Sequence, residues 1–237
     1  MKDLSSLINS WIILLVYSGW ILWMEFVPRI YRFMGLGGRA NSSVLAAIRM
    51  TILLLWTYCF VRVVEKKTFS AGFNISFQNW MRSVVWGVIF AVIALAAVSV
   101  FQFVIVIPIL KKMIAASNSA VQMSAKSRGE RLLEYVYVVY EGFIEVLIFI
   151  GFLLDRLAAR WKPAAALVVS NVGFALWHYQ YLKKGLLEGS LMIFLTFLAG
   201  LVISLSYLKT RNSLSSVISH TGVDAPGAIM ELMGIMP

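Results

Sequence analysis

Long apolar runs follow one another along most of this chain, and they limit its fold more than any other feature. A bilayer core of about 30 Å is crossed by about 20 apolar residues in a helix, and several runs reach that length. Apolar residues make up 60% of the chain and charged residues only 14%, which excludes an ordinary soluble enzyme. The sequence predicts an all-α, polytopic transmembrane helix bundle with about seven to eight spans.

The expected spans are 8–27, 44–64, 84–110, 132–154, 164–181 and 187–208, with a shorter run at 214–223. The run at 8–27 is followed by no cleavage pattern, so we expect a retained span rather than a signal peptide. The residues after Pro226 are too few to cross a membrane alone. They are expected to be re-entrant, interfacial or a terminal half-helix.

The chain carries 21 lysines and arginines against 11 acidic residues, a net charge of +10. Most basic residues lie between apolar runs, where they meet lipid headgroups, so a lipid bilayer and no nucleic acid is expected as partner. A basic linker at 111–131 separates a three-span segment at 1–110 from core spans at 132–237. We expect these parts to form one integrated membrane domain.

Ionisable side chains inside the predicted spans concentrate in 132–237. Glu141 and Glu145 lie four residues apart on one face of a helix. The chain has two histidines, His178 and His220, and Asp224 shares a face with His220 four residues earlier. Because neighbouring spans alternate in direction, Glu145, both histidines and Asp224 fall in one layer within about 12 Å of depth. Ionisable groups kept in hydrocarbon are candidates for function, so a shared site on three helices is predicted.

A structural interpretation competes with the functional one at each of these positions. A single histidine in a membrane is often only an interhelical hydrogen-bond partner. The matching depth of four rare groups favours a site. Glu141 remains open, because it could support Glu145 or bond another helix.

Three stretches in this order resemble the motifs of a known family. Residues 145–151 read EVLIFIG, where the family motif is EExxxRG. Residues 174–178 read FALWH, as in FxxxH, and residues 220–224 read HTGVD, as in HxxxN or HxxxD. The chain is therefore similar to the CAAX-protease and bacteriocin-processing (CPBP, Abi) family of intramembrane glutamate-type endopeptidases over about residues 130–230.

The chain departs from the first motif at two positions. Val146 stands where the family has a second glutamate, and Ile150 stands where it has an arginine. If those two groups normally pair, losing both leaves no orphan charge. The departure also fits a member that no longer cleaves.

The resemblance implies an intramembrane endopeptidase that cleaves near the C-terminus of a membrane-associated or lipidated protein. It implies that Glu145 and His178 activate water, that His220 and Asp224 form the oxyanion side, and that no cofactor is needed. Glu141 is a possible supporting residue. The expected location is multi-pass in a prokaryotic cell membrane.

Three alternatives remain from the sequence. Zinc held by His178, His220 and Glu145 with an open fourth position is a possible catalytic set, although HExxH is absent. A catalytically inactive membrane scaffold or immunity protein of the same fold would also fit the changed first motif. A small transporter or proton relay is less well supported, because neither an internal repeat nor paired broken helices are found.

Overall fold

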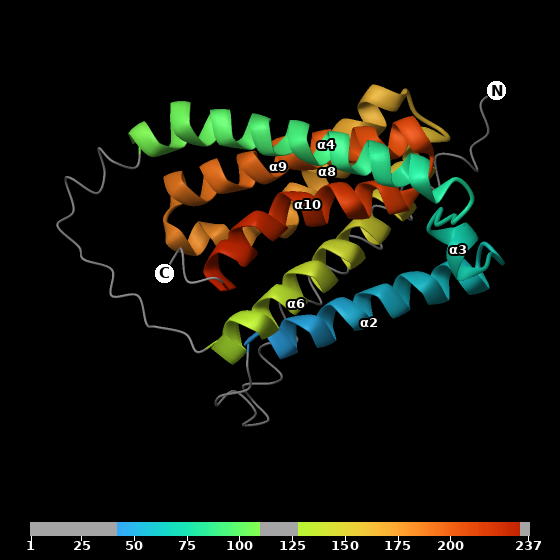
Figure 1. Cartoon of the computed structure of the whole chain (residues 1–237). Helices are drawn as coiled ribbons and strands as arrows, with labels where there is room; N and C mark the ends of the chain where they lie inside the picture. Colours follow the sequence, from blue (N-terminus) through green and yellow to red (C-terminus); the bar gives the residue numbers. More distant parts are fainter. Residues whose placement is uncertain (1–41, 110–127, 233–237) are drawn as a thin grey trace.

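The computed structural model describes residues 42–109 and 128–232, and every regular element in these ranges is a helix (Figure 1). The predicted all-α fold class is therefore confirmed. The expected span at 8–27 and most of the linker at 111–131 lie outside the described residues. In chain order the elements are α2 (Ser42–Val63), α3 (Phe69–Gly72), α4 (Trp80–Phe101), the π-helix η1 (Gln102–Val106), α6 (Arg128–Glu145), the π-helix η2 (Val146–Leu154), α7 (Asp155–Ala158), α8 (Pro163–Trp177), the 3-10 helix η3 (Tyr179–Lys184), α9 (Leu186–Thr210) and α10 (Ser213–Leu232).

Three stretches of the described chain are long and apolar enough to cross a membrane: Trp80–Ile109, Tyr135–Ala158 and Leu186–Thr210. The helix Pro163–Trp177 is apolar but shorter. α4 leaves large apolar side chains such as Val88 exposed, as expected of a helix that faces lipid. A total of about seven to eight spans stays a prediction.

α10 packs against α4, α6 and α9 (Figure 1). Small residues allow it to approach α4 closely, since a Cβ atom at Gly87 would lie 2.7 Å from Ile218 Cβ. A Cβ atom at Gly222 would likewise lie 2.8 Å from the Cβ of Ala91. Close backbone approach of this kind is what holds helices together in lipid. It places the first-half helix α4 directly against the helix that carries His220.

α6 lies between α2 and α10 (Figure 1). Thr51 of α2 and Tyr140 of α6 share a hydrogen bond of 2.5 Å between their hydroxyl oxygens. A neighbour on each side explains why the end of α6 is fully buried, with Ile144 at 0% exposure. The helix therefore carries Glu145 into the interior of the bundle.

α6 continues without a break into the π-helix η2, which begins at the residue after Glu145. Side chains from other elements donate hydrogen bonds to carbonyl oxygens of η2. Ser170 Oγ donates to Phe149 O at 2.5 Å, and Asn74 Nδ2 donates to Gly151 O at 3.1 Å. Short π-helical segments are frequent at functional sites.

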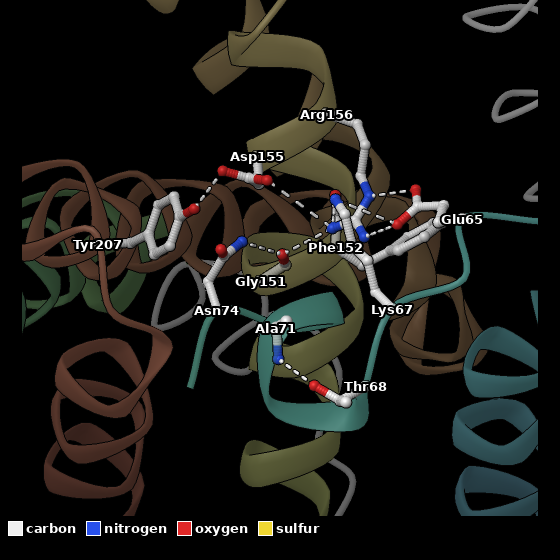
Figure 2. Close-up of polar contacts among 10 residues, drawn as sticks. All are labelled: Glu65, Lys67, Thr68, Ala71, Asn74, Gly151, Phe152, Asp155, Arg156 and Tyr207. Carbon is white, nitrogen blue, oxygen red and sulfur yellow. Dashed lines mark hydrogen bonds and ion pairs between the residues drawn. The ribbon is translucent and has the colours of Figure 1, made fainter. Parts of the chain in front are cut away.

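Arg156 links the C-terminal end of η2 to the segment that follows α2 through hydrogen bonds (Figure 2). Its Nη1 donates to the carbonyl oxygens of Gly151 at 3.1 Å and Phe152 at 3.2 Å. Its Nε and Nη2 donate to the two carboxylate oxygens of Glu65 at 2.9 and 2.5 Å. Burial raises the pKa of the Glu65 carboxyl, but the hydrogen bonds and charge of Arg156 outweigh burial and hold it below its ordinary value of 4.5.

Two predicted boundaries are wrong. The span expected at 164–181 ends at Trp177, because the N–H of His178 bonds to the carbonyl of Ala175 and the chain tightens into the 3-10 turn η3. The last span does not end at 223, because α10 continues through Pro226 to Leu232. Proline removes one backbone N–H and can kink a helix, yet here the helix carries on.

Candidate active site

Glu145 faces both histidines from the junction of α6 and η2. Its Oε1 lies 3.6 Å from His178 Nε2, and its Oε2 lies 3.3 Å from His220 Nε2. Asp224 Oδ2 in turn lies 2.8 Å from His220 Nδ1. Four residues predicted to share a layer are thus in direct contact, although they come from α6, the end of α8, and α10.

The site is closed at Glu145 and opens towards Asp224. The side chain of Glu145 is 1% exposed, those of His220 and His178 are 9% and 13%, and that of Asp224 is 36%. No described residue donates a hydrogen bond to Glu145 Oε1. Because 3.6 Å exceeds hydrogen-bonding distance, this oxygen and His178 Nε2 face each other without a direct hydrogen bond.

His220 reaches Glu145 because Gly142 makes room for it. A Cβ atom at position 142 would lie 2.8 Å from His220 Nδ1 and 3.3 Å from its Cε1. On its other side, the imidazole faces Asp224 one turn further along α10. Nδ1 and Oδ2 are at ion-pair distance, but they do not form a well-aligned hydrogen bond. We therefore treat the contact as electrostatic.

Phe174 supports both imidazoles. Its ring meets His178 edge-on at 5.2 Å and His220 edge-on at 5.7 Å between ring centroids. Its carbonyl oxygen lies 3.1 Å from His178 Nδ1. Since a carbonyl only accepts, Nδ1 carries the hydrogen in this contact, and Nε2 is the nitrogen that faces Glu145.

The two positions where the chain departs from the family motif lie in the apolar core. Val146 is 1% exposed and Ile150 is 5% exposed, and both belong to the cluster of buried apolar residues around η2. A charged residue at either position would need a partner to be stable there. Two apolar residues suit these surroundings without one.

Polar residues beyond these four extend along α6 towards α2. Glu141 lies one turn before Glu145, and the hydroxyl of Tyr137 is within hydrogen-bonding reach of Glu141. Arg49 of α2 acts electrostatically on Tyr137, and its Nε is buried with no partner among the described residues. Arg49 and Tyr137 were not among the sequence candidates. A charged residue inside the predicted span 44–64 was the signal that could have identified Arg49.

Within residues 42–109 and 128–232, no three His, Cys, Asp or Glu side chains are grouped as a metal site requires. Zinc coordination by His178, His220 and Glu145 therefore remains an alternative that rests on residue types alone.

A buried carboxylate between two imidazoles within apolar helices is the kind of polar cluster that marks a candidate functional site in a membrane protein. Residues 130–226 match the family described as type II CAAX prenyl endopeptidase, Rce1-like. This part of the chain contains all four contacting residues and is similar to the CAAX-protease family, as the motifs indicated. The apolar helices indicate an integral membrane protein, and the family match implies a hydrolase that cleaves peptide bonds.

No curated protein and no solved structure is significantly similar to the chain.

Proposed function

We propose that the protein is an intramembrane endopeptidase that uses Glu145 to activate water. Its substrate is a membrane-associated or lipidated protein, cleaved at a peptide bond near the C-terminus. The observation that carries this proposal is the buried Glu145 carboxylate held between two imidazoles. The family match over residues 130–226 supports the reaction class.

The first step uses the side of Glu145 that faces His178. A water that lies beside Glu145 Oε1 and His178 Nε2, which are 3.6 Å apart, can donate a hydrogen bond to each atom. Its oxygen attacks the carbonyl carbon of the substrate, one proton passes to Glu145, and the carbonyl becomes an oxyanion. A carboxylate shielded from bulk water is suited to this exchange, since fixed groups replace solvent around the reacting atoms.

The second step uses the opposite side of the site. His220 donates through Nε2 towards Glu145 Oε2 at 3.3 Å. Once Glu145 holds the proton, that attraction weakens, and the same N–H can stabilise the oxyanion. Asp224 keeps His220 oriented from its other nitrogen. The proton then passes from Glu145 to the leaving amine as the carbon–nitrogen bond breaks.

Glu141 fits a supporting role, because its carboxylate acts on that of Glu145 along the same helix face. The zinc mechanism has less support, because it needs three protein ligands around the metal. The His, Cys, Asp and Glu side chains of the described residues form no such group. The inactive scaffold is supported by Val146 and Ile150 alone, and the contact of Glu145 with both histidines favours a working site over it. We therefore propose that the protein is catalytically active.

The proposal is tested with the full chain in lipid nanodiscs and a lipid-modified peptide that carries a fluorophore and a quencher on either side of its C-terminal bonds. We expect cleavage by the wild type and at least about a hundredfold lower kcat for E145Q and H178A. Glu188→Gln, in the first turn of α9, is the matched control and should cleave as the wild type does. Equal cleavage by E145Q and the wild type would exclude Glu145 as the base.

A further inference from the structure

His178 is not held by a regular helix. It follows the last residue of α8, and its backbone angles of φ −87° and ψ 22° lie outside the helical range. The direction of its ring therefore depends on the side chains around it. One is Phe174, which meets the imidazole edge-on and bonds its Nδ1 through the backbone carbonyl.

The other side chain is Tyr181 of η3, which stacks on the face of the imidazole. The ring centroids are 5.6 Å apart and the ring planes are inclined by 29°. Tyr181 is partly buried, and Lys184 Nζ lies over its ring at 5.8 Å from the centroid. The imidazole is therefore confined by an edge contact from α8 and a face contact from η3.

Tyr181 itself is fixed by the packing of η3 on the start of α9. Gly189 allows this packing, since a Cβ atom there would lie 2.5 Å from Leu182 Cα and 2.6 Å from the carbonyl oxygen of Tyr181. Both clashes are with backbone, which cannot rotate away as a side chain can. Gly185, at φ 119°, turns the chain between η3 and α9 in a conformation that favours glycine. Two glycines thus set the position of the tyrosine ring.

We propose that Tyr181 is a positioning residue, whose ring holds the imidazole of His178 in the orientation that aims Nε2 at Glu145. The inference rests on the proposed function, because it assigns how one group of that site is oriented. Tyr181 need not touch the substrate for this role. Stacking on His178 gives the Tyr181 ring a specific role beyond packing.

The ring and the hydroxyl of Tyr181 make different contributions, and only the ring is needed for stacking. Burial, followed by the nearby charge of Glu145, raises the pKa of Tyr181 to about 12. The phenol therefore stays protonated at neutral pH, and no charge on it is available to orient the imidazole. Phenylalanine at this position should keep the function, whereas alanine should lose it.

The activity test compares Y181A, Y181F and Y181L in the full chain with the lipid-modified peptide described above. We expect Y181A and Y181L to lose about tenfold to a hundredfold in kcat with little change in KM, because misplacement of a reacting group by about 1 Å costs that much. Y181F should remain within about threefold of the wild type. Tyr179→Ala is the matched control, since Tyr179 lies in the same turn and is 36% exposed.

Gly189→Ala tests the same inference without changing the tyrosine. It should displace η3 and lower kcat as Y181A does, because its Cβ meets the backbone of Tyr181 and Leu182. Wild-type kcat in both Y181A and G189A, while E145Q is inactive, would overturn the positioning role and leave the proposed function intact. Loss of activity in Y181F equal to that in Y181A would also overturn it, because the hydroxyl rather than the ring would then be required.

The orientation of His178 can also be followed by NMR without any cleavage, because the chain has two histidines. With the imidazoles labelled with carbon-13 at Cε1, the full chain in nanodiscs gives two resonances, and H220Q assigns them. Loss of the stacked ring in Y181L should shift the Hε1 signal of His178 downfield and leave that of His220 unchanged. An unchanged Hε1 signal of His178 in Y181L would overturn the inference. This outcome can be read even if the protein cleaves no peptide.

Discussion

Gly142 of α6 and His220 of α10 lie so close that a Cβ atom at position 142 would stand 2.8 Å from His220 Nδ1. The imidazole therefore occupies the space that any other residue at 142 would fill. Because the same ring contacts Glu145 and Asp224, the glycine decides whether the polar groups of two helices can meet.

We expect G142A to reduce cleavage about tenfold or more, because its methyl group displaces His220 from Glu145. The loss should appear mainly in kcat, and the melting temperature should change little, since a side chain rather than backbone gives way. Gly129→Ala on the same helix is the control, because nothing lies within 4 Å of the position that its Cβ would take. A fully active G142A would show that the approach of His220 is not needed.

Asp224 orients His220 through a contact of 2.8 Å. We expect D224A to lose this contact and most of the activity, by about tenfold to a hundredfold. D224N should keep more activity than D224A, because the partial negative charge of an amide oxygen still attracts His220 Nδ1, whereas a methyl group does not. Steady-state cleavage by the two variants measures the difference. Cleavage by D224A at a rate equal to or above that of D224N would contradict the role assigned to Asp224.

Glu65 pairs with Arg156, whose side chain is only 7% exposed. We expect E65Q to lower the free energy of unfolding by about 2–3 kcal/mol, because a charge-assisted hydrogen bond is lost and the buried guanidinium keeps only the longer ion pair with Asp155, at 3.9 Å. Lys67→Ala should have a much smaller effect, since Lys67 is 47% exposed and lies 3.5 Å from Glu65. Thermal unfolding in detergent compares the two. Equal melting temperatures for E65Q and K67A would contradict this view of the ion pair.

The same pair predicts a pH dependence of stability. Arg156 holds the pKa of Glu65 below the ordinary value of 4.5 in the folded chain, so the unfolded chain binds more protons in that range. The contribution of the pair is present above about pH 4.5 and is lost as the pH falls through the folded pKa. The melting temperature of the wild type should therefore fall more steeply below about pH 4.5 than that of E65Q. Parallel curves for the two proteins would show that Glu65 does not titrate as proposed.

Chelation separates the two proposed chemistries of the site. With glutamate as the base and no metal, we expect cleavage to persist after prolonged dialysis against 1,10-phenanthroline. The zinc alternative at Glu145, His178 and His220 expects loss of cleavage that added zinc restores. Peptide cleavage before dialysis, after dialysis and after zinc addition is the measurement.

The sequence by itself determined features that are local to one helix. The lengths of the apolar runs indicated a helical membrane protein. The four-residue spacing of His220 and Asp224 placed both on one face of a helix, and in α10 they are in contact. Depth counting along single helices also brought Glu145 and His178 to one layer, because the rise per residue is constant.

Only the tertiary structure decided how these faces meet. That Gly142 admits His220, that Tyr181 stacks on His178, and that Arg156 holds the carbonyls of η2 all depend on contacts between elements far apart in the chain. Periodicity tells which residues share a face, but not which helix lies against that face or how closely. The approach of two helices is set by the smallest side chains between them, and such a glycine carries no sequence signal until its neighbour is known.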